Sequence, residues 1–340
     1  MGKKIEKIAV LGAGSWGAAI AAHLSRNGHD LSLWEFDSQQ AELLKENRVL
    51  SLLPTFTIPA QIKITSQLEE AVDGREIIIF AVPSHFIRST AQAAIKANFN
   101  PQIVISAAKG IENETMFRMS EVLEEELGIN FKDKIVVLSG PSHAEEVFRQ
   151  IPTAVVSASS NPKAALKAQE IFTNDFFRVY TNPDVVGVET GAALKNVIAI
   201  GCGICDGLGL GDNSKAALVT RGLQELVRLG LKMGAQEKTF FGLAGVGDLI
   251  VTCFSRHSRN RLLGEKIGQG KTLAEALGEM TMVAEGVKTA KAIHSLSKKY
   301  QLDLPISDEV YKILYEGKKP ETAVRDLLTR QATTEIKNYE

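Results

Sequence analysis

The pattern of hydrophobic positions changes character about halfway along the chain. In the first half, short apolar runs rich in β-branched residues alternate with longer segments of helical periodicity. Several runs are apolar nearly throughout, which is typical of parallel strands buried on both faces. We predict strands at 5–11, 31–34, 62–65, 77–82, 103–107, 135–138, 154–157 and 177–180.

Helix start and stop signals lie between these strands. A helix predicted at 15–27 ends at Gly28, and one at 114–127 ends at Gly128; glycine readily adopts the left-handed conformation that ends helices. Asn161, followed by proline, can cap a third helix. This alternation predicts an α/β fold, a Rossmann-like doubly wound sheet with helices on both faces, over residues 1–185.

The strand signal stops after the turn at Asn182-Pro183. A helix is predicted at 185–200 with a glycine-rich continuation at 201–211, then a helix at 214–233 whose two apolar rows indicate burial on most sides. Residues 186–340 therefore read as an all-α domain. Its other predicted helices are 238–243, 258–268, 272–278, 286–300, 307–316 and 320–329.

Composition and charge narrow the class of protein. The 340 residues carry 39 Lys+Arg against 40 Asp+Glu, a balance that argues against a nucleic-acid partner. Three cysteines cannot form a secreted disulfide framework. The longest strongly apolar runs, such as 77–82, are far short of a membrane span, and no signal-peptide core precedes the first strand. We expect a cytoplasmic protein with a sizeable core.

A glycine motif follows the first predicted strand and opens a helix. Gly12 allows the tight turn, Gly14 lets the backbone approach a pyrophosphate, and Gly17 lets helix and strand pack closely. The helix N-terminus adds N–H groups and the positive end of a dipole. This context predicts a dinucleotide site. The alternative is an ordinary glycine-rich turn.

The end of the second strand bears on the choice of cofactor. Glu35 lies 18 residues after Gly17, near the spacing of about 20 residues expected for an acid that binds the ribose. Such a carboxylate repels a 2′-phosphate, and no Lys or Arg stands between residues 31 and 44. We therefore expect NAD rather than NADP. Alternatively, Glu35 and Asp37 are solvated loop acids.

Ligands of such sheets bind beyond the carboxyl ends of the strands. Three candidate segments follow strands there, carrying Ser84, Lys109 and Ser142, the last a possible cap of the next helix. Lys109 would place a cation near cofactor and substrate. The alternative is a surface lysine in a tight turn.

Lys195 stands among the small and apolar residues of 191–200, which predicts at least partial burial. Burial and nearby cations lower the pKa of a lysine and suit it to proton transfer near neutral pH. The alternative is a buried lysine paired with an acid such as Asp248, without chemistry.

The stretch 255–261 holds three Arg and one His, with no acid. Ser258 can cap the following helix beside Arg259, and a helix start with a guanidinium suits a phosphate. A solvated basic turn is the alternative.

Cys202 and Cys205 lack enough partner ligands for zinc, so we interpret the cysteines as packing residues and expect no metal.

Together these motifs resemble those of the NAD(P)-dependent glycerol-3-phosphate dehydrogenases of the bacterial soluble type. The resemblance runs in order along nearly the whole chain, and the combination is very specific. It rests on residues 10–17, 108–112, 138–144, 189, 194–196, 207–213, 243–249, 258–260, 285–287 and 305–306.

The resemblance implies roles for individual residues. Lys195 would be the proton acceptor in the oxidation direction, with Lys109 and Asp248 in the same catalytic group. Many bacterial relatives carry Arg or His where this chain has Glu35-Phe36, a departure that favours NAD. Cofactor contacts are implied at Gly12, Gly14, Ser15, Trp16, Gly17, Glu35, Phe36, Lys109, Ala144, Arg259, Val283 and Glu285. Substrate contacts are implied at Lys109, Gly140, Ser142, Lys195, Asn196, Asp248, Ser258, Arg259 and Asn260.

The implied reaction is reduction of dihydroxyacetone phosphate to sn-glycerol 3-phosphate, the backbone of phospholipids, with the active site in the seam of the two domains. The helical half would allow a homodimer. Two alternatives stay open: a related two-domain dehydrogenase of β-hydroxy acids or sugar acids, and a non-catalytic NAD-sensing protein. The first predicts a carboxylate site; the second predicts no turnover.

Overall fold

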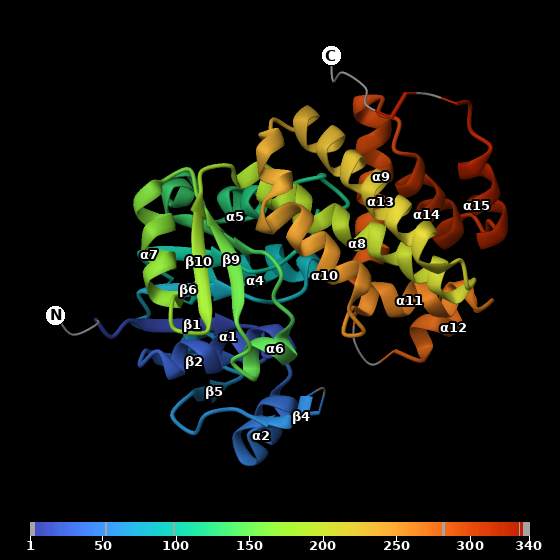
Figure 1. Ribbon diagram of the computed structural model, residues 1–340. Helices are drawn as coiled ribbons and strands as arrows, with labels where there is room; N and C mark the ends of the chain where they lie inside the picture. The colour runs from blue at the N-terminus through green and yellow to red at the C-terminus, as the bar shows by residue number, and fades with distance from the viewer. Residues whose placement is uncertain (1–3, 52, 98, 281–282, 333, 336–340) are drawn as a thin grey trace. The chain divides into compact units, whose positions relative to one another are not determined.

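The computed structural model describes residues 4–51, 53–97, 99–280, 283–332 and 334–335. The chain divides into two compact units. The first contains Met1–Glu112 and Phe117–Glu189, and the second contains Asn113–Met116 and Thr190–Glu340. Each unit is described by itself (Figure 1).

An eight-stranded sheet forms the centre of the first unit, and a strand lies in each segment predicted to hold one. The strands are β1 (Lys7–Leu11), β2 (Asp30–Trp34), β5 (Lys63–Thr65), β6 (Ile77–Phe80), β7 (Ile103–Ser106), β8 (Ile135–Ser139), β9 (Thr153–Ala158) and β10 (Phe177–Asn182). A short hairpin of β3 (Val49–Leu50) and β4 (Leu53–Thr57), which the sequence did not predict, stands apart from this sheet.

The strand order is β10-β9-β8-β7-β6-β1-β2-β5. The six strands from β8 to β5 are parallel and reverse their order at β1, as in a doubly wound dinucleotide-binding sheet. The expectation of parallel strands is wrong for β9 and β10, because β9 pairs antiparallel with β8 and β10 pairs parallel with β9. The five-residue helix α6 (Ala144–Phe148) does not return the chain to the start of β8, so β9 begins beside the end of β8.

Helices cover both faces of the sheet, as predicted. Ile8 and Val10 point into one core, shared with helices α1 (Ser15–Arg26), α6 and α7 (Pro162–Phe172). The alternate residues of β1, Ala9 and Leu11, belong to the opposite core. Helices α3 (Leu68–Val72), α4 (Ile87–Lys96) and α5 (Met119–Leu127) contribute to that second core, while α2 (Ser38–Asn47) lies after β2.

The predicted helix at 114–127 is wrong at its start. Helix α5 begins at Met119, because the chain first makes a turn closed by a bridge between Ile111 and Arg118. Met116 has a φ of 63° in this turn, a conformation outside the right-handed helix.

The second unit is helical, and its first helix is longer than predicted. Helix α8 (Val185–Gly207), which starts in the first unit, continues through residues 201–207 of the segment expected to be a glycine-rich continuation. A Cβ added to Gly203 would lie 1.9 Å from the Arg261 carbonyl oxygen, and one on Gly264 would lie 2.0 Å from that of Ile200. Helices α8 and α11 (Arg259–Gly268) therefore approach backbone to backbone, and this contact offsets the low helix propensity of glycine.

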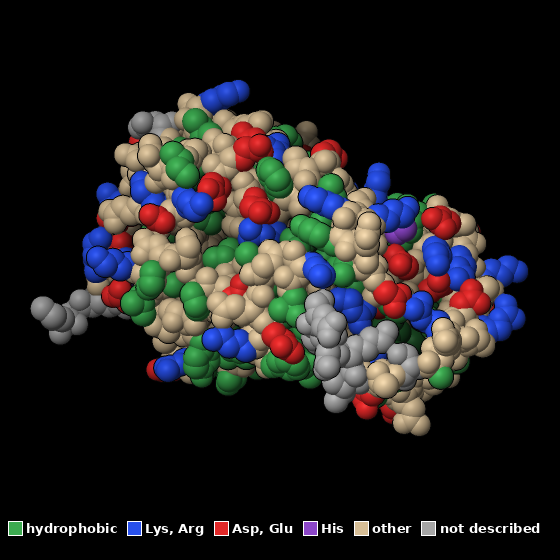
Figure 2. Space-filling model, turned by 90° about the horizontal axis from the view of Figure 1, so that it is seen from above, with side chains coloured by type: hydrophobic (Ala, Val, Ile, Leu, Met, Phe, Trp, Pro, Cys, Tyr) green, Lys and Arg blue, Asp and Glu red, His purple; other side chains and the backbone are tan. Residues whose placement is uncertain are grey.

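By length and composition α8 is apolar enough to cross a membrane, but 89% of its apolar stretch is buried inside the protein. It is packed as a core helix. On the face shown in Figure 2, basic and acidic side chains intermingle, in keeping with the near-equal counts of the two charges.

The remaining helices lie close to the predicted segments, with one correction. They are α9 (Gly211–Lys232), α12 (Leu273–Gly278), α13 (Glu285–Tyr300), α14 (Pro305–Tyr315) and α15 (Pro320–Leu328). The predicted helix at 238–243 is instead a 3₁₀ helix, η3 (Glu237–Phe241), followed by a π-helical turn, η4 (Leu243–Gly247). That turn leads into α10 (Asp248–Phe254), which the sequence did not predict.

Candidate active site

The glycine loop joins β1 to α1 with the geometry a dinucleotide site requires. Gly12 has a φ of 111°, and a Cβ on Gly17 would lie 1.8 Å from the Gly12 carbonyl oxygen, so a side chain is excluded at both positions. Nothing lies within 4 Å of a Cβ built on Gly14, which leaves the backbone there open to a ligand. The residues present therefore fit a pyrophosphate at the N-terminus of α1. Ser15 and Trp16 open that helix.

Glu35 lies just beyond β2, partly buried next to this loop. Its carboxylate accepts a hydrogen bond from the backbone N–H of Asp37 at 3.1 Å. Burial raises the pKa of Glu35 above its ordinary value. Asp37 has a different task, because its side chain caps α2. Phe36 is 82% exposed, and its ring packs edge-on against that of Trp34.

The polar residues after β7 and β8 converge on one carbonyl group. Lys109 Nζ donates to the Gly140 oxygen at 3.1 Å, and Ser142 Oγ donates to the same oxygen at 2.9 Å. Gly140 itself has a φ of 134° and packs against Val155. Ser142 does not cap the next helix as predicted, because α6 begins at the buried Ala144 after an N-cap at His143. The sheet thus brings Lys109, Gly140 and Ser142 together.

In the second unit, Lys195 forms a buried ion pair on the inner face of α8. Its Nζ lies 2.6 Å from Asp248 Oδ1 and 2.8 Å from Thr252 Oγ1, and each of the three residues is at most 5% exposed. Thr252 Oγ1 in turn donates to the Asp248 backbone oxygen, one turn back on α10. The pairing of Lys195 with Asp248 holds one ammonium group in a fixed, buried position.

Sequence reasoning missed Thr252 because it missed α10. With that helix known, Asp248 and Thr252 stand four residues apart on one face, where both reach the same lysine.

The side chains of the basic stretch at 255–261 have different partners and do not act as one cluster. Ser258 Oγ accepts from the Arg261 N–H at 3.2 Å and caps α11, as predicted. The guanidinium of Arg261 pairs with Asp206 at 2.6 Å, so this arginine serves the internal structure. Arg259 is the first residue of α11 and is partly exposed, and Arg256 is exposed.

Two buried asparagines form a chain of hydrogen bonds across three helices. Asn260 Nδ2 donates to Asn196 Oδ1 at 3.0 Å, and Asn260 Oδ1 accepts from the Gly286 N–H at 2.9 Å. A Cβ on Gly286 would lie 2.7 Å from the Asn196 carbonyl oxygen, so the start of α13 packs closely against the backbone of α8. Glu285 is the first residue of that helix, and Val283, half exposed, stands just before it.

Replacing Asn260 by Ala is expected to lower the free energy of unfolding by about 2–6 kcal/mol, since an unsatisfied buried polar group costs about 1–3 kcal/mol and two would be left. Urea unfolding measures the change. The matched control is Asn47→Ala on an exposed site, for which we expect about 0.5 kcal/mol or less. An equal loss of unfolding free energy in the two variants would contradict a stabilising role for this chain of hydrogen bonds.

The three cysteines are buried and free, in keeping with packing residues. Burial raises the pKa of Cys205 to about 12, which keeps it a thiol. Among the described residues, no group of His, Cys, Asp and Glu has the arrangement of a metal site.

Two family models match this chain, and together they cover most of it. The model of the NAD-dependent glycerol-3-phosphate dehydrogenase N-terminus matches residues 7–165, and that of the C-terminus matches residues 184–325.

Curated relatives agree with these models. A protein named glycerol-3-phosphate dehydrogenase [NAD(P)+] from Pelotomaculum thermopropionicum is 51% identical over 331 residues, which cover 97% of this chain and 95% of the relative. One of the same name from a Thermoanaerobacter species is 53% identical over 330 residues, covering 97% and 99%.

Among solved structures, the crystal structure of glycerol-3-phosphate dehydrogenase from Coxiella burnetii superposes with a TM-score of 0.91 at 36% identity. The match covers 96% of this chain and 99% of that one.

Proposed function

This chain belongs to the NAD-dependent glycerol-3-phosphate dehydrogenase family, and from that premise we propose that it reduces dihydroxyacetone phosphate to sn-glycerol 3-phosphate, reversibly, with NAD(P)H. The observation that carries the proposal is the buried Lys195–Asp248–Thr252 cluster, a held proton donor of the kind a carbonyl reduction needs. The test is oxidation of NADH that depends on dihydroxyacetone phosphate.

Residues 1–185 are proposed as the NAD(P)-binding domain. The open backbone at Gly14 would take the pyrophosphate, and Glu35 would face the ribose. The other cofactor contacts are proposed at Gly12, Ser15, Trp16, Gly17, Phe36, Lys109, Ala144, Arg259, Val283 and Glu285.

Residues 186–340 are proposed as the substrate domain. The phosphate of the substrate would bind at the start of α11, where Arg259 offers a bidentate guanidinium next to the helix N-terminus. Ser258 and Asn260 would act there chiefly by fixing this helix, since one caps it and the other bonds to Asn196 and Gly286.

Proton transfer is proposed at Lys195. When bound, the reduced cofactor supplies a hydride to C2 of the ketone. The Lys195 ammonium donates its proton to the C2 oxygen as charge develops there, and the cations of Lys195 and Lys109 stabilise that charge. Lys195 then regains a proton from solvent. Asp248 and Thr252 orient the ammonium group throughout.

The relatives are named as NAD(P)+ enzymes, so membership of the family leaves the choice between NAD and NADP open. We expect Glu35 to decide which of the two this enzyme prefers. Glu35→Ala should raise kcat/KM for NADPH relative to NADH, because removal of the carboxylate relieves its repulsion of the 2′-phosphate. Steady-state kinetics with both cofactors measure the ratio. The matched control is Asp37→Ala, which removes the helix cap of α2 and should leave the ratio unchanged. An unchanged ratio in the Glu35 variant means that Glu35 does not face the ribose.

We further propose that the enzyme works in the cytoplasm, possesses no nucleic-acid partner or membrane span, and feeds glycerophospholipid synthesis. A homodimer is compatible with the helical domain. A dehydrogenase of β-hydroxy acids or sugar acids is the less favoured alternative, because relatives named glycerol-3-phosphate dehydrogenase match this chain over nearly their whole length.

A further inference from the structure

The second unit holds a large pocket that contains none of the proposed cofactor or substrate residues. Its volume is about 1040 Å³, the size of small-molecule binding sites. One face of α9 forms its floor, and the start of α14, helix α15 and residues 330–332 and 334–335 form its sides. The residues of α9 that face it follow helical spacing: Ser214, Ala217, Leu218, Arg221, Glu225 and Arg228.

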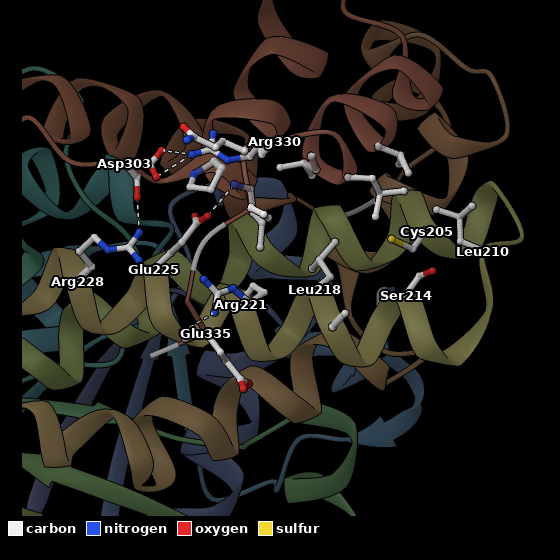
Figure 3. Close-up of a pocket in the computed structure, with 18 of the residues that line it drawn as sticks. Cys205, Leu210, Ser214, Leu218, Arg221, Glu225, Arg228, Asp303, Arg330 and Glu335 are labelled. Atoms are coloured by element: carbon white, nitrogen blue, oxygen red, sulfur yellow. Dashed lines mark hydrogen bonds and ion pairs between the residues drawn. The ribbon is translucent and has the colours of Figure 1, made fainter. Parts of the chain in front are cut away.

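The pocket is polar at one end and apolar at the other. Figure 3 shows Glu225, Arg228, Asp303 and Arg330 gathered at one end, with Leu218 and Leu210 toward the opposite end. Side chains of α15, including Leu327 and Leu328, add to the apolar lining. A ligand that matches this gradient has a charged head and a hydrocarbon chain.

The charges at the polar end are paired with one another or with the backbone. Glu225 accepts from the Ile306 and Ser307 N–H groups at 2.6 and 3.0 Å and thereby caps α14. Arg330 makes two contacts of 2.8 Å with the Asp303 carboxylate, and Arg228 donates to the Asp303 backbone oxygen. These groups build the wall of the pocket and carry little net attraction for a ligand.

Arg221 differs from them. It lies between the polar and apolar ends, partly buried, and donates to the Glu335 backbone oxygen at 3.1 Å. Among the residues that the structure describes, none forms an ion pair with Arg221. A guanidinium has five donors, and that of Arg221 lies against apolar lining with no carboxylate partner within the described part of the chain, so it is complementary to an anionic head group.

We propose that this pocket binds an amphipathic anion with an unbranched hydrocarbon chain and a carboxylate head. The carboxylate pairs with Arg221, and the chain lies along Leu218 toward Leu210. At about 1.5 Å of rise per residue, Ser214 and Arg221 are separated by about 10 Å along α9, which suits a chain of medium length.

The experiment measures binding of decanoate to the full-length protein by isothermal titration calorimetry, at concentrations below micelle formation. Arg221→Gln is expected to weaken decanoate binding about tenfold or more, as loss of a hydrogen bond to a charged group predicts. The matched control, Arg178→Gln on the exposed part of β10, should bind as the wild type does. Decanol, which lacks the charge, should bind wild type and Arg221→Gln equally, and this second measurement shows that the variant pocket is intact.

Four results would overturn the proposal. The first is no decanoate binding to the wild type, and the second is unchanged affinity in Arg221→Gln. The third is binding only after deletion of residues 336–340, which would assign the pocket to the chain's own C-terminus. The fourth is a wild-type dimer that Leu218→Asn dissociates in light scattering, which would assign it to a second copy of the chain.

Discussion

Replacing Lys195 by Met is expected to lower kcat about 10²–10⁴-fold, the usual contribution of a positioned general acid, while the dissociation constant of NADH stays nearly unchanged. The reason is that Lys195 is the ammonium group held by Asp248 and Thr252 in the buried cluster, at 2.6 and 2.8 Å. Methionine keeps most of the side-chain volume but removes the ammonium group, with its charge, its proton and its hydrogen bonds. Steady-state turnover and a separate NADH titration measure the two quantities.

The substitution removes the cation of a buried ion pair with Asp248, and removal of one member of such a pair costs about 3–5 kcal/mol of stability. Unfolding curves must therefore accompany the kinetics, so that lost activity is compared at equal folded fraction. Lys232→Met, at the exposed end of α9, is the matched control and should retain full turnover. If the folded Lys195 variant turns over near the wild-type rate, the proton is donated by another group.

Replacing Arg259 by Ala is expected to raise KM for dihydroxyacetone phosphate about 10–100-fold, because a charge-assisted hydrogen bond is worth about 1.5–3 kcal/mol. Arg259 lies at the first position of α11, where its guanidinium and the helix start favour the same anion. Unphosphorylated dihydroxyacetone lacks the group that Arg259 binds. Its weak turnover should therefore change little in the variant.

Arg261→Ala is the informative control, since this arginine is two residues further along the same helix but pairs with Asp206. It should lower stability and leave KM for the phosphorylated ketone close to that of the wild type. If kcat/KM falls by the same factor for dihydroxyacetone and for dihydroxyacetone phosphate in the Arg259 variant, Arg259 does not bind the phosphate.

The sequence predicts the sheet well because buried parallel strands are short apolar runs, and runs such as Ile77–Phe80 have no helical periodicity. Strand direction is harder to predict. Whether β9 runs parallel or antiparallel to β8 depends on how far the intervening segment carries the chain, and an apolar run looks the same in either direction.

In the helical half, the errors arise where tertiary contacts override local preference. Glycines such as Gly203 and Gly207 argue locally against a helix, yet α8 continues because α11 packs on them at backbone distance. Lys195 and Asp248 could each be named from the sequence, but whether they pair depends on how α8 packs against α10. Their pairing was therefore only one of two possible interpretations. Thr252 could not be named, because its place on α10 follows from the π-helical turn before it.

The most direct test of the proposed function is the absorbance of reduced nicotinamide, followed as purified protein is mixed with NADH or NADPH and dihydroxyacetone phosphate. We expect oxidation of the reduced cofactor that depends on dihydroxyacetone phosphate, is faster with NADH, and yields sn-glycerol 3-phosphate in equal amount. Cofactor binding without substrate-dependent oxidation, or faster oxidation with a β-keto acid than with the phosphorylated ketone, would contradict the account.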